Sequence, residues 1–205
     1  MGYKTILAHV DVGKSTAGTL SVALDLANRF EAHLVGLHIH RRFESPMYSE
    51  ASAALDLLYK SYEQAVKAEE DAAAATFRSV VGANVSSEWR VADGFPEDAL
   101  LSHARRVDLV VMGQHDSEGP PIATPRDFAE KFTLVSERPV LIVPHIGAAK
   151  PVGQKILLCW NGRREAARAA TAALPLLKKA QSVTVLIVDP HTSDCLLYTS
   201  DAADE

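Results

Sequence analysis

Hydrophobic and polar positions follow two alternating patterns along most of the chain. Short runs of apolar and β-branched residues predict buried strands, and these lie at residues 3–10, 33–40, 85–91, 107–113 and 139–144. Between them, apolar residues recur every three or four positions, which predicts amphipathic helices at residues 14–30, 49–81, 97–106 and 126–135. This regular alternation of strand and helix indicates an α/β domain over residues 1–147.

The alternation also predicts how the strands are arranged. Right-handed crossovers produce a parallel sheet covered on both faces, and we expect a doubly wound five-stranded sheet of order 3-2-1-4-5. Ligands of such sheets bind beyond the carboxyl ends of the strands, where the strand order reverses. Asp11, Ile39, Asp93 and Gly113 stand at or just past predicted strand ends, so they are candidate site residues. Asp93 is also expected to open an Asp-Gly-Phe-Pro turn.

The pattern of the first strand and helix returns later in the chain. Residues 6–11 align with residues 156–161, and Gly13 falls opposite Gly162 after a one-residue adjustment. A helical stretch at 164–180 and a strand at 183–188 follow, as in the first copy. Duplication of a domain explains this repeat, so we expect a linker at 148–154 and the truncated start of a second such domain, a partial second copy, at 155–190.

The last residues, 191–205, show no pattern of helix or strand. From Cys195 to Asp204 they resemble the in-frame translation of a transposon-end sequencing adapter. We therefore expect this tail to be non-native and leave it out of the fold prediction.

Composition narrows the class of protein. The formal net charge is -5, and no broad basic surface is expected, which argues against nucleic acid as a partner. No apolar run approaches the roughly 20 residues of a membrane span, and no signal segment precedes the first strand. The two cysteines are too few for a disulfide framework. These features predict a soluble cytoplasmic protein that binds no membrane.

Residues 8–16 nearly match a phosphate-binding loop, in which backbone amides cradle phosphates and a lysine neutralises them. Gly13-Lys14-Ser15 would be its end. Two features argue against such a loop. Ala8 stands at the position where the loop usually has its first glycine. Asp108 lies at the start of its strand, whereas a magnesium-linked aspartate lies at the end of one. A P-loop nucleoside triphosphatase using Gly13-Lys14-Ser15 is therefore the alternative hypothesis, and an adenylating α/β enzyme is a weaker third one.

The eight histidines do not predict a metal site. His38 and His40 share one face of a strand and His115 follows Gly113, but zinc sites need three or four convergent ligands in a recognisable spacing. We interpret these histidines as surface or strand-end residues. No motif pairs a nucleophile with a base, so we predict no catalytic residue, no metal, and a binding or regulatory protein that is not an enzyme.

Several of these features together resemble the universal stress protein family. They are the order of elements, Asp11 after the first strand, the Val-Val-Met-Gly ending at Gly113, and the closing Arg-Pro-Val-Leu-Ile-Val-Pro run at 138–144. Residues 154–169 resemble the opening of the second domain in tandem members. The resemblance implies an adenine-nucleotide α-hydrolase-like sheet, a role in stress response, and pairing through the last strand, either as a homodimer or with the second domain of the same chain.

The resemblance also implies an ATP site in some members. There, the residue after strand one and the end of strand two frame the adenosine, which corresponds to Asp11 and Ile39. A glycine-rich motif holds the phosphates, and its first glycine corresponds to Gly113. Its later positions fall on Asp116, Arg126 and Asp127, where two carboxylates would repel phosphates. We therefore expect ATP to bind with low affinity or not at all, at an altered site, and no cofactor is certain.

Overall fold

The computed structural model describes residues 2–41, 52–115, 125–147 and 151–188. The chain divides into two compact units, one covering Gly2–Val152 and the other beginning at Gly153. This division falls within the predicted linker at 148–154. The tail at 191–205, with its adapter-like segment from Cys195, lies outside the described residues.

The first unit contains one parallel sheet. Its strands are β1 (Thr5–His9), β2 (His33–Arg41), β3 (Ser87–Gly94), β4 (Leu109–Gly113) and β5 (Val140–Val143). They are ordered β3-β2-β1-β4-β5, and each neighbouring pair is parallel. The predicted fold class and strand order, 3-2-1-4-5, are therefore confirmed.

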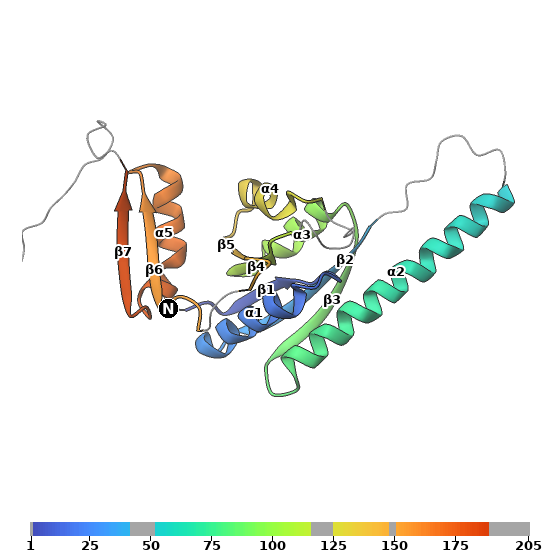
Figure 1. Cartoon of the computed structure of the whole chain (residues 1–205), viewed down its shortest axis with the longest axis horizontal. Coiled ribbons are helices and arrows are strands. Elements are labelled where there is room, and N and C mark those ends of the chain that lie inside the picture. The colour runs from blue at the N-terminus through green and yellow to red at the C-terminus, as the bar shows by residue number, and fades with distance from the viewer. Residues whose placement is uncertain (1, 42–51, 116–124, 148–150, 189–205) are drawn as a thin grey trace, which may run out of the picture. The chain divides into compact units, whose positions relative to one another are not determined.

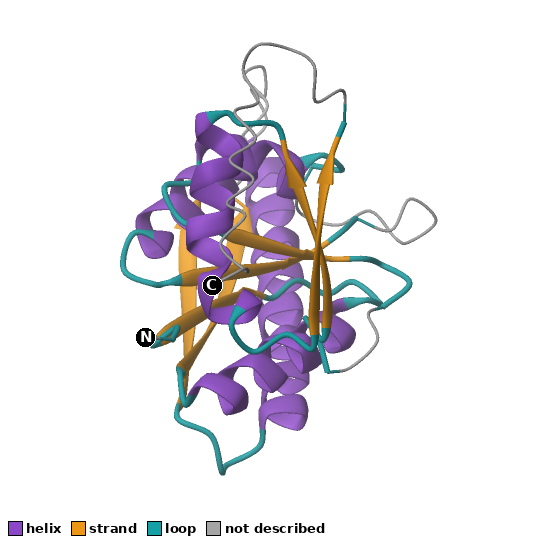
Figure 2. Cartoon of the chain, turned by 90° about the vertical axis from the view of Figure 1, so that its left-hand side faces the viewer, coloured by secondary structure: helices purple, strands orange, loops and turns teal. Residues whose placement is uncertain are grey.

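Four helices cover this sheet (Figures 1 and 2). They are α1 (Thr16–Phe30), α2 (Ser52–Val81), α3 (Pro96–Ala104) and α4 (Phe128–Val135). α1 and α2 lie on one face, and α3 and α4 on the other. Strands β1 and β4 are buried at most positions because they lie in the middle of the sheet with helices on both faces.

Side chains alternate between the two faces along β2. Val35, Leu37 and Ile39 join the core beneath α3 and α4, which also contains Leu100 and Phe132. The intervening residues face the α1–α2 side. There the Phe77 ring fills the space over Gly36, so closely that a Cβ at this glycine would lie 2.5 Å from the ring.

The predicted turn at Asp93 is wrong. Asp93 and Gly94 are the last residues of β3, where they pair with His40 and Arg41 of β2. The Asp93 carboxylate also lies 3.0 Å from His40 Nδ1. Contacts with the neighbouring strand thus extend the strand through a dipeptide that favours turns in isolation.

The second unit is a smaller strand–helix–strand arrangement. Strands β6 (Lys155–Trp160) and β7 (Ser182–Ile187) are parallel, and α5 (Arg164–Leu177) connects them. Helix α5 packs on one face of this two-stranded sheet (Figure 1). Its order of elements is that of β1, α1 and β2.

Candidate functional site

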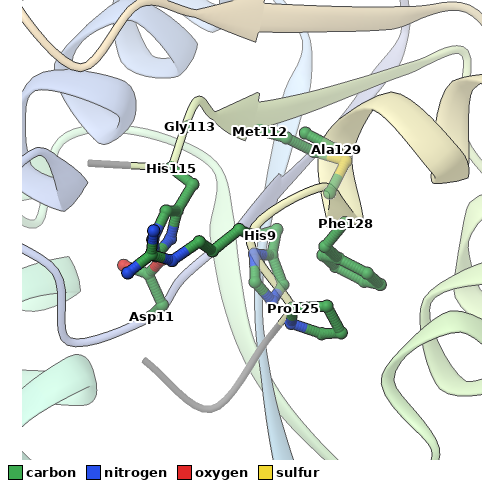
Figure 3. Close-up of a pocket in the computed structure, with 9 residues that line it drawn as sticks. His9, Asp11, Met112, Gly113, His115, Pro125, Phe128 and Ala129 are labelled. Atoms are coloured by element: carbon green, nitrogen blue, oxygen red, sulfur yellow. The ribbon is translucent and has the colours of Figure 1, made fainter. Parts of the chain in front are cut away.

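A small pocket lies at the carboxyl ends of β1 and β4, beside the start of α4 (Figure 3). It is the place where the strand order reverses, between the first and fourth strands of the sheet. Its cavity volume is about 20 Å³, and the residues that line it are His9, Asp11, Met112, Gly113, His115, Pro125, Arg126, Phe128 and Ala129. Two of the three predicted binding residues, Asp11 and Gly113, are thus brought together, although 102 positions separate them.

Asp11 shapes the turn between β1 and α1. Its Oδ1 accepts a hydrogen bond from the Gly13 backbone N–H at 2.9 Å and another from the Thr16 hydroxyl. Ser15 holds the N-cap position of α1 but makes no capping hydrogen bond with its side chain. Asp11 therefore supplies the oxygen that organises this helix start, in the manner of an Asx turn.

Gly113 lies against the first turns of α1. A Cβ at this position would lie 2.9 Å from Thr19 Oγ1 and 3.7 Å from Ser15 Oγ. Thr19 is 1% exposed and cannot move aside into solvent. The absence of a side chain at 113 is therefore what allows β4 to approach α1 at the pocket.

His9 is a site residue that the sequence prediction missed. Its side chain is buried, and its ring lies 5.5 Å from that of Phe128, centroid to centroid. Burial lowers the pKa of His9 below its ordinary value, although the nearby Asp11 charge opposes this shift. The signal was a histidine at the end of a buried strand, a position shared by too many core histidines to identify a site.

Ile39, the third predicted binding residue, does not line the pocket. Its side chain is 4% exposed and packs into the core beneath α3 and α4. Only the backbone of Ile39 therefore remains available to a ligand at the carboxyl end of β2. Its neighbours His38 and His40 share the opposite face of β2, as predicted, with ring centroids 5.4 Å apart.

His38 is nevertheless not a surface residue. It is buried, and its Nδ1 lies 2.8 Å from the Val10 carbonyl oxygen. The Val10 N–H also donates a hydrogen bond to the Leu37 carbonyl. This bond and the His38 contact hold the residue after β1 against β2, beyond the residues that pair in the sheet. Within the described part of the chain, no three His, Cys, Asp or Glu residues converge as a metal site would require.

The predicted phosphate positions separate in the structure. Arg126 lines the pocket, whereas Asp127 does not. Asp127 is the N-cap residue of α4, and its carboxylate lies 2.7 Å from Lys131 Nζ, which holds its pKa below the usual range. The predicted repulsion from Asp127 is therefore offset by its own lysine. Asp116 lies outside the described residues.

The Gly13-Lys14-Ser15 segment does not form a phosphate cradle. The Gly13 N–H is bonded to Asp11, and the Gly13 carbonyl accepts the Thr16 N–H at 3.1 Å. Lys14 is exposed and does not line the pocket. These groups build the helix start instead of surrounding an anion, and nothing in the geometry supports the P-loop alternative.

The second unit repeats the turn of the first. Asn161 Oδ1 accepts a hydrogen bond from the Arg163 N–H at 3.0 Å, just as Asp11 accepts one from Gly13. In both units the oxygen belongs to the residue that follows the first strand by one or two positions.

Comparison with known protein families decides the identity. The model of the Universal stress protein family matches residues 2–144. The chain belongs to this family. No curated protein matches this universal stress protein at significant similarity, and no helix in its described residues is long and apolar enough to span a membrane.

Solved structures show how far the family fold extends. Universal stress protein UspA from Lactobacillus plantarum is 19% identical, with a TM-score of 0.52, and the match covers 69% of this chain and 98% of that one. The hypothetical protein MJ0577 is 15% identical, with a TM-score of 0.53, over 70% of this chain and 97% of that one. A universal stress protein from Archaeoglobus fulgidus DSM 4304 is 14% identical, with a TM-score of 0.61, over 93% of this chain and 68% of that one. This last likeness of fold covers more of the chain than the other two.

Proposed function

We propose that this universal stress protein is a cytoplasmic, non-catalytic regulator in a stress response that binds an adenine nucleotide. The observation that carries the proposal is the meeting of Asp11 and Gly113 in one pocket at the reversal of strand order. This is where sheets of this architecture bind ligands. Gly113 allows β4 to pack closely on α1 at this pocket, because a Cβ there would lie 2.9 Å from Thr19 Oγ1.

The adenosine end of the ligand would lie beyond β1 and β2. The Asp11 carboxylate accepts two hydrogen bonds through Oδ1, and we assign its Oδ2 to a ribose hydroxyl. Ile39 would contribute through its backbone, since its side chain is committed to the core. The cavity volume of about 20 Å³ is far below the roughly 300 Å³ of a typical ligand pocket, so the described residues enclose only part of the ligand.

The phosphate end differs from the pattern of ATP-binding relatives, and we propose that ATP binds with low affinity and is not hydrolysed. Arg126 and Asp127 stand where the resemblance implies glycine and a hydroxyl residue. Close backbone approach to a triphosphate is obstructed by side chains at both positions.

Isothermal titration calorimetry of the full chain with adenosine, AMP, ADP and ATP tests this proposal. We expect measurable binding of at least one adenine ligand, ATP affinity weaker than micromolar, and no phosphate release from ATP. The triple variant Asp116→Gly, Arg126→Gly, Asp127→Ser should bind ATP more tightly than the unmodified chain. Failure of every adenine ligand, adenosine included, would overturn the nucleotide proposal, and turnover of ATP would overturn the non-catalytic one.

A further inference from the structure

The amino-terminal half of helix α2 extends past the end of the sheet (Figure 1). Among the described side chains of α2, the buried ones all lie in its second half: Ala73, Ala74, Phe77 and Val81. Residues 56–67, here called the α2 arm, contain no buried residue. A helical stretch of about 12–15 residues is marginal in water without packing, so the arm is a surface that a partner would stabilise.

An apolar stripe runs along the α2 arm. Its members are spaced three or four residues apart, which places them on one face of the helix, and they are Leu58, Tyr59, Tyr62 and Val66. Ala73 follows Val66 by two helical turns, so the stripe continues the face that α2 buries in the domain. Leu58 is 55% exposed and Tyr59 is 48% exposed. The core-facing side of α2 thus runs on beyond the body of the domain as an exposed apolar surface.

A row of alternating charges flanks this stripe. Asp56, Lys60, Glu63 and Lys67 follow one another at intervals of four, three and four residues, so they also lie along one side of the helix. All four are exposed. If the row meets a copy of itself running in the opposite direction, every charge lies opposite one of the other sign. Lys60 then faces Glu63 of the second copy, and Asp56 faces its Lys67.

The position of the stripe favours the same alignment. The midpoint of the charged row lies between residues 61 and 62, and the midpoint of the apolar stripe falls at the same place. One crossing point therefore brings both sets of residues together, as a two-fold axis requires. In a parallel pair the charged row would instead face the opposite flank of the stripe, which holds the uncharged Ser61, Ala65 and Ala68.

The central charges are available for such a contact. Lys67 Nζ lies 3.1 Å from Glu70 Oε1 and 3.1 Å from Asp71 Oδ1, so it is shared with its own helix. Among the described residues, no ion pair joins Lys60 or Glu63 to another group. A single exposed ion pair contributes little to affinity. We therefore assign the driving force to the apolar stripe and the choice of partner and direction to the charges.

We infer that the α2 arm is an interface between two copies of this chain, in which the two arms lie antiparallel. The apolar stripes pack on each other, and Lys60 of each copy pairs with Glu63 of the other. This surface differs from the free edge of β5, because α2 packs near β2 and β3 at the opposite side of the sheet. It does not depend on the binding of a nucleotide.

Exchange of the two central charges tests the interface in the full chain. Lys60→Glu and Glu63→Lys each place like charges opposite one another, and we expect each single variant to associate about tenfold more weakly or less, as measured by sedimentation equilibrium. A mixture of the two variants again brings opposite charges together. Its association should return to within about threefold of that of the unmodified chain. Circular dichroism melts establish that each variant is folded.

Two matched controls accompany these variants. Arg78→Glu makes the same change of charge as Lys60→Glu, at an exposed residue in the last turn of α2 and outside the arm. It should leave association unchanged, and mixing it with Glu63→Lys should restore nothing. Leu58→Ser should weaken association about tenfold through the loss of buried apolar area. Leu57→Ser, at a 73% exposed position on the side of the helix opposite the stripe, should change it less than about twofold.

Recovery on mixing is the decisive result. An ion pair between Lys60 and Glu63 of one chain would also be broken by the single substitutions, but mixing two chains could not restore it. The inference is therefore overturned if the mixture does not recover, if the single variants associate as tightly as the unmodified chain, or if the unmodified chain is monomeric throughout. Association that survives all of these changes and is lost in Leu141→Lys belongs to the edge of β5, and this outcome also overturns the inference.

Discussion

Thr19 occupies the space that a side chain at position 113 would need, with its Oγ1 2.9 Å from the place of a Cβ on Gly113. Thr19 is a short β-branched residue with little rotameric freedom, and it is almost fully buried. The packing of α1 on β4 beside the pocket therefore depends on glycine at this point.

We expect Gly113→Ala to destabilise the protein by about 1–3 kcal/mol, as is typical for overpacking, and to weaken ligand binding. Gly18→Ala is the control, because Gly18 is in α1 and, apart from its own stretch of helix, no atom lies within 4 Å of the place that an added Cβ would take. That change should stabilise α1 by about 0.5–1 kcal/mol. Urea unfolding followed by circular dichroism measures both, and equal effects of the two substitutions would contradict the packing argument.

The turn after β1 gives a second prediction. Asp11→Ala removes the oxygen that accepts the Gly13 N–H and the Thr16 hydroxyl, and we expect a loss of about 0.5–2 kcal/mol in the free energy of unfolding, as for a lost helix cap. Asp11→Asn keeps an oxygen in place and should retain most of the stability. Thermal melts of the two variants should differ; if they coincide, the carboxylate does not organise this turn.

Substitution of Lys14 tests whether the chain is a binding protein or the P-loop nucleoside triphosphatase of the alternative hypothesis. Because Lys14 is exposed and lies outside the pocket lining, we expect Lys14→Ala to leave nucleotide affinity within about twofold. A phosphate-binding loop would lose most of its affinity with its lysine. Calorimetric titration of the unmodified chain and this variant with ATP and AMP distinguishes the two.

The buried imidazole of His9 predicts a dependence of stability on pH. Its pKa is lowered in the folded protein, so the unfolded chain binds the proton more readily. The contribution of His9 to stability is therefore complete above the unfolded pKa of about 6.5 and is lost as the pH falls below it. His9→Gln should lessen the fall in stability between about pH 7.5 and 5.5, measured by urea unfolding; identical slopes in the two proteins would contradict this assignment.

The outer edge of β5 is the surface that we propose for pairing with a second copy or with the second domain. β5 ends the sheet, so one side of its backbone has no neighbouring strand within the described first unit. Leu141→Lys should shift the chain toward the monomer in analytical ultracentrifugation, since a charge at an edge opposes pairing. Leu134→Lys, at an 87% exposed position on α4, is the control, and an unchanged sedimentation coefficient in both variants would argue against this surface.

Much of the fold could be predicted because its signals are local and repeated. Each strand is a compact apolar run, and the alternation with helices restricts the topology to a few arrangements. The end of β3 was mispredicted because Asp93 is held in the strand by His40, a partner 53 positions away. No local pattern contains that contact.

The site was predictable only in part, for a related reason. Asp11 and Gly113 stand at strand ends, and strand ends meet along one edge of a parallel sheet. His9 and Ile39 depend instead on which way a side chain points in its strand, and a shift of one residue reverses that direction. Ile39 consequently packs into the core, while His9 reaches the pocket.

The turns at Asp11 and Asn161 share one backbone hydrogen bond but carry side chains of different charge. In one unit a carboxylate oxygen accepts the backbone N–H two residues on, and in the other an amide oxygen does so at nearly the same length. The loop needs only an oxygen, so the electric charge at this position can change without disturbing the scaffold. A charged acceptor favours ligands that offer donors, whereas a neutral amide both donates and accepts. Two turns with the same hydrogen bond can in this way acquire different ligand preferences through a single exchange of an oxygen for an NH₂ group.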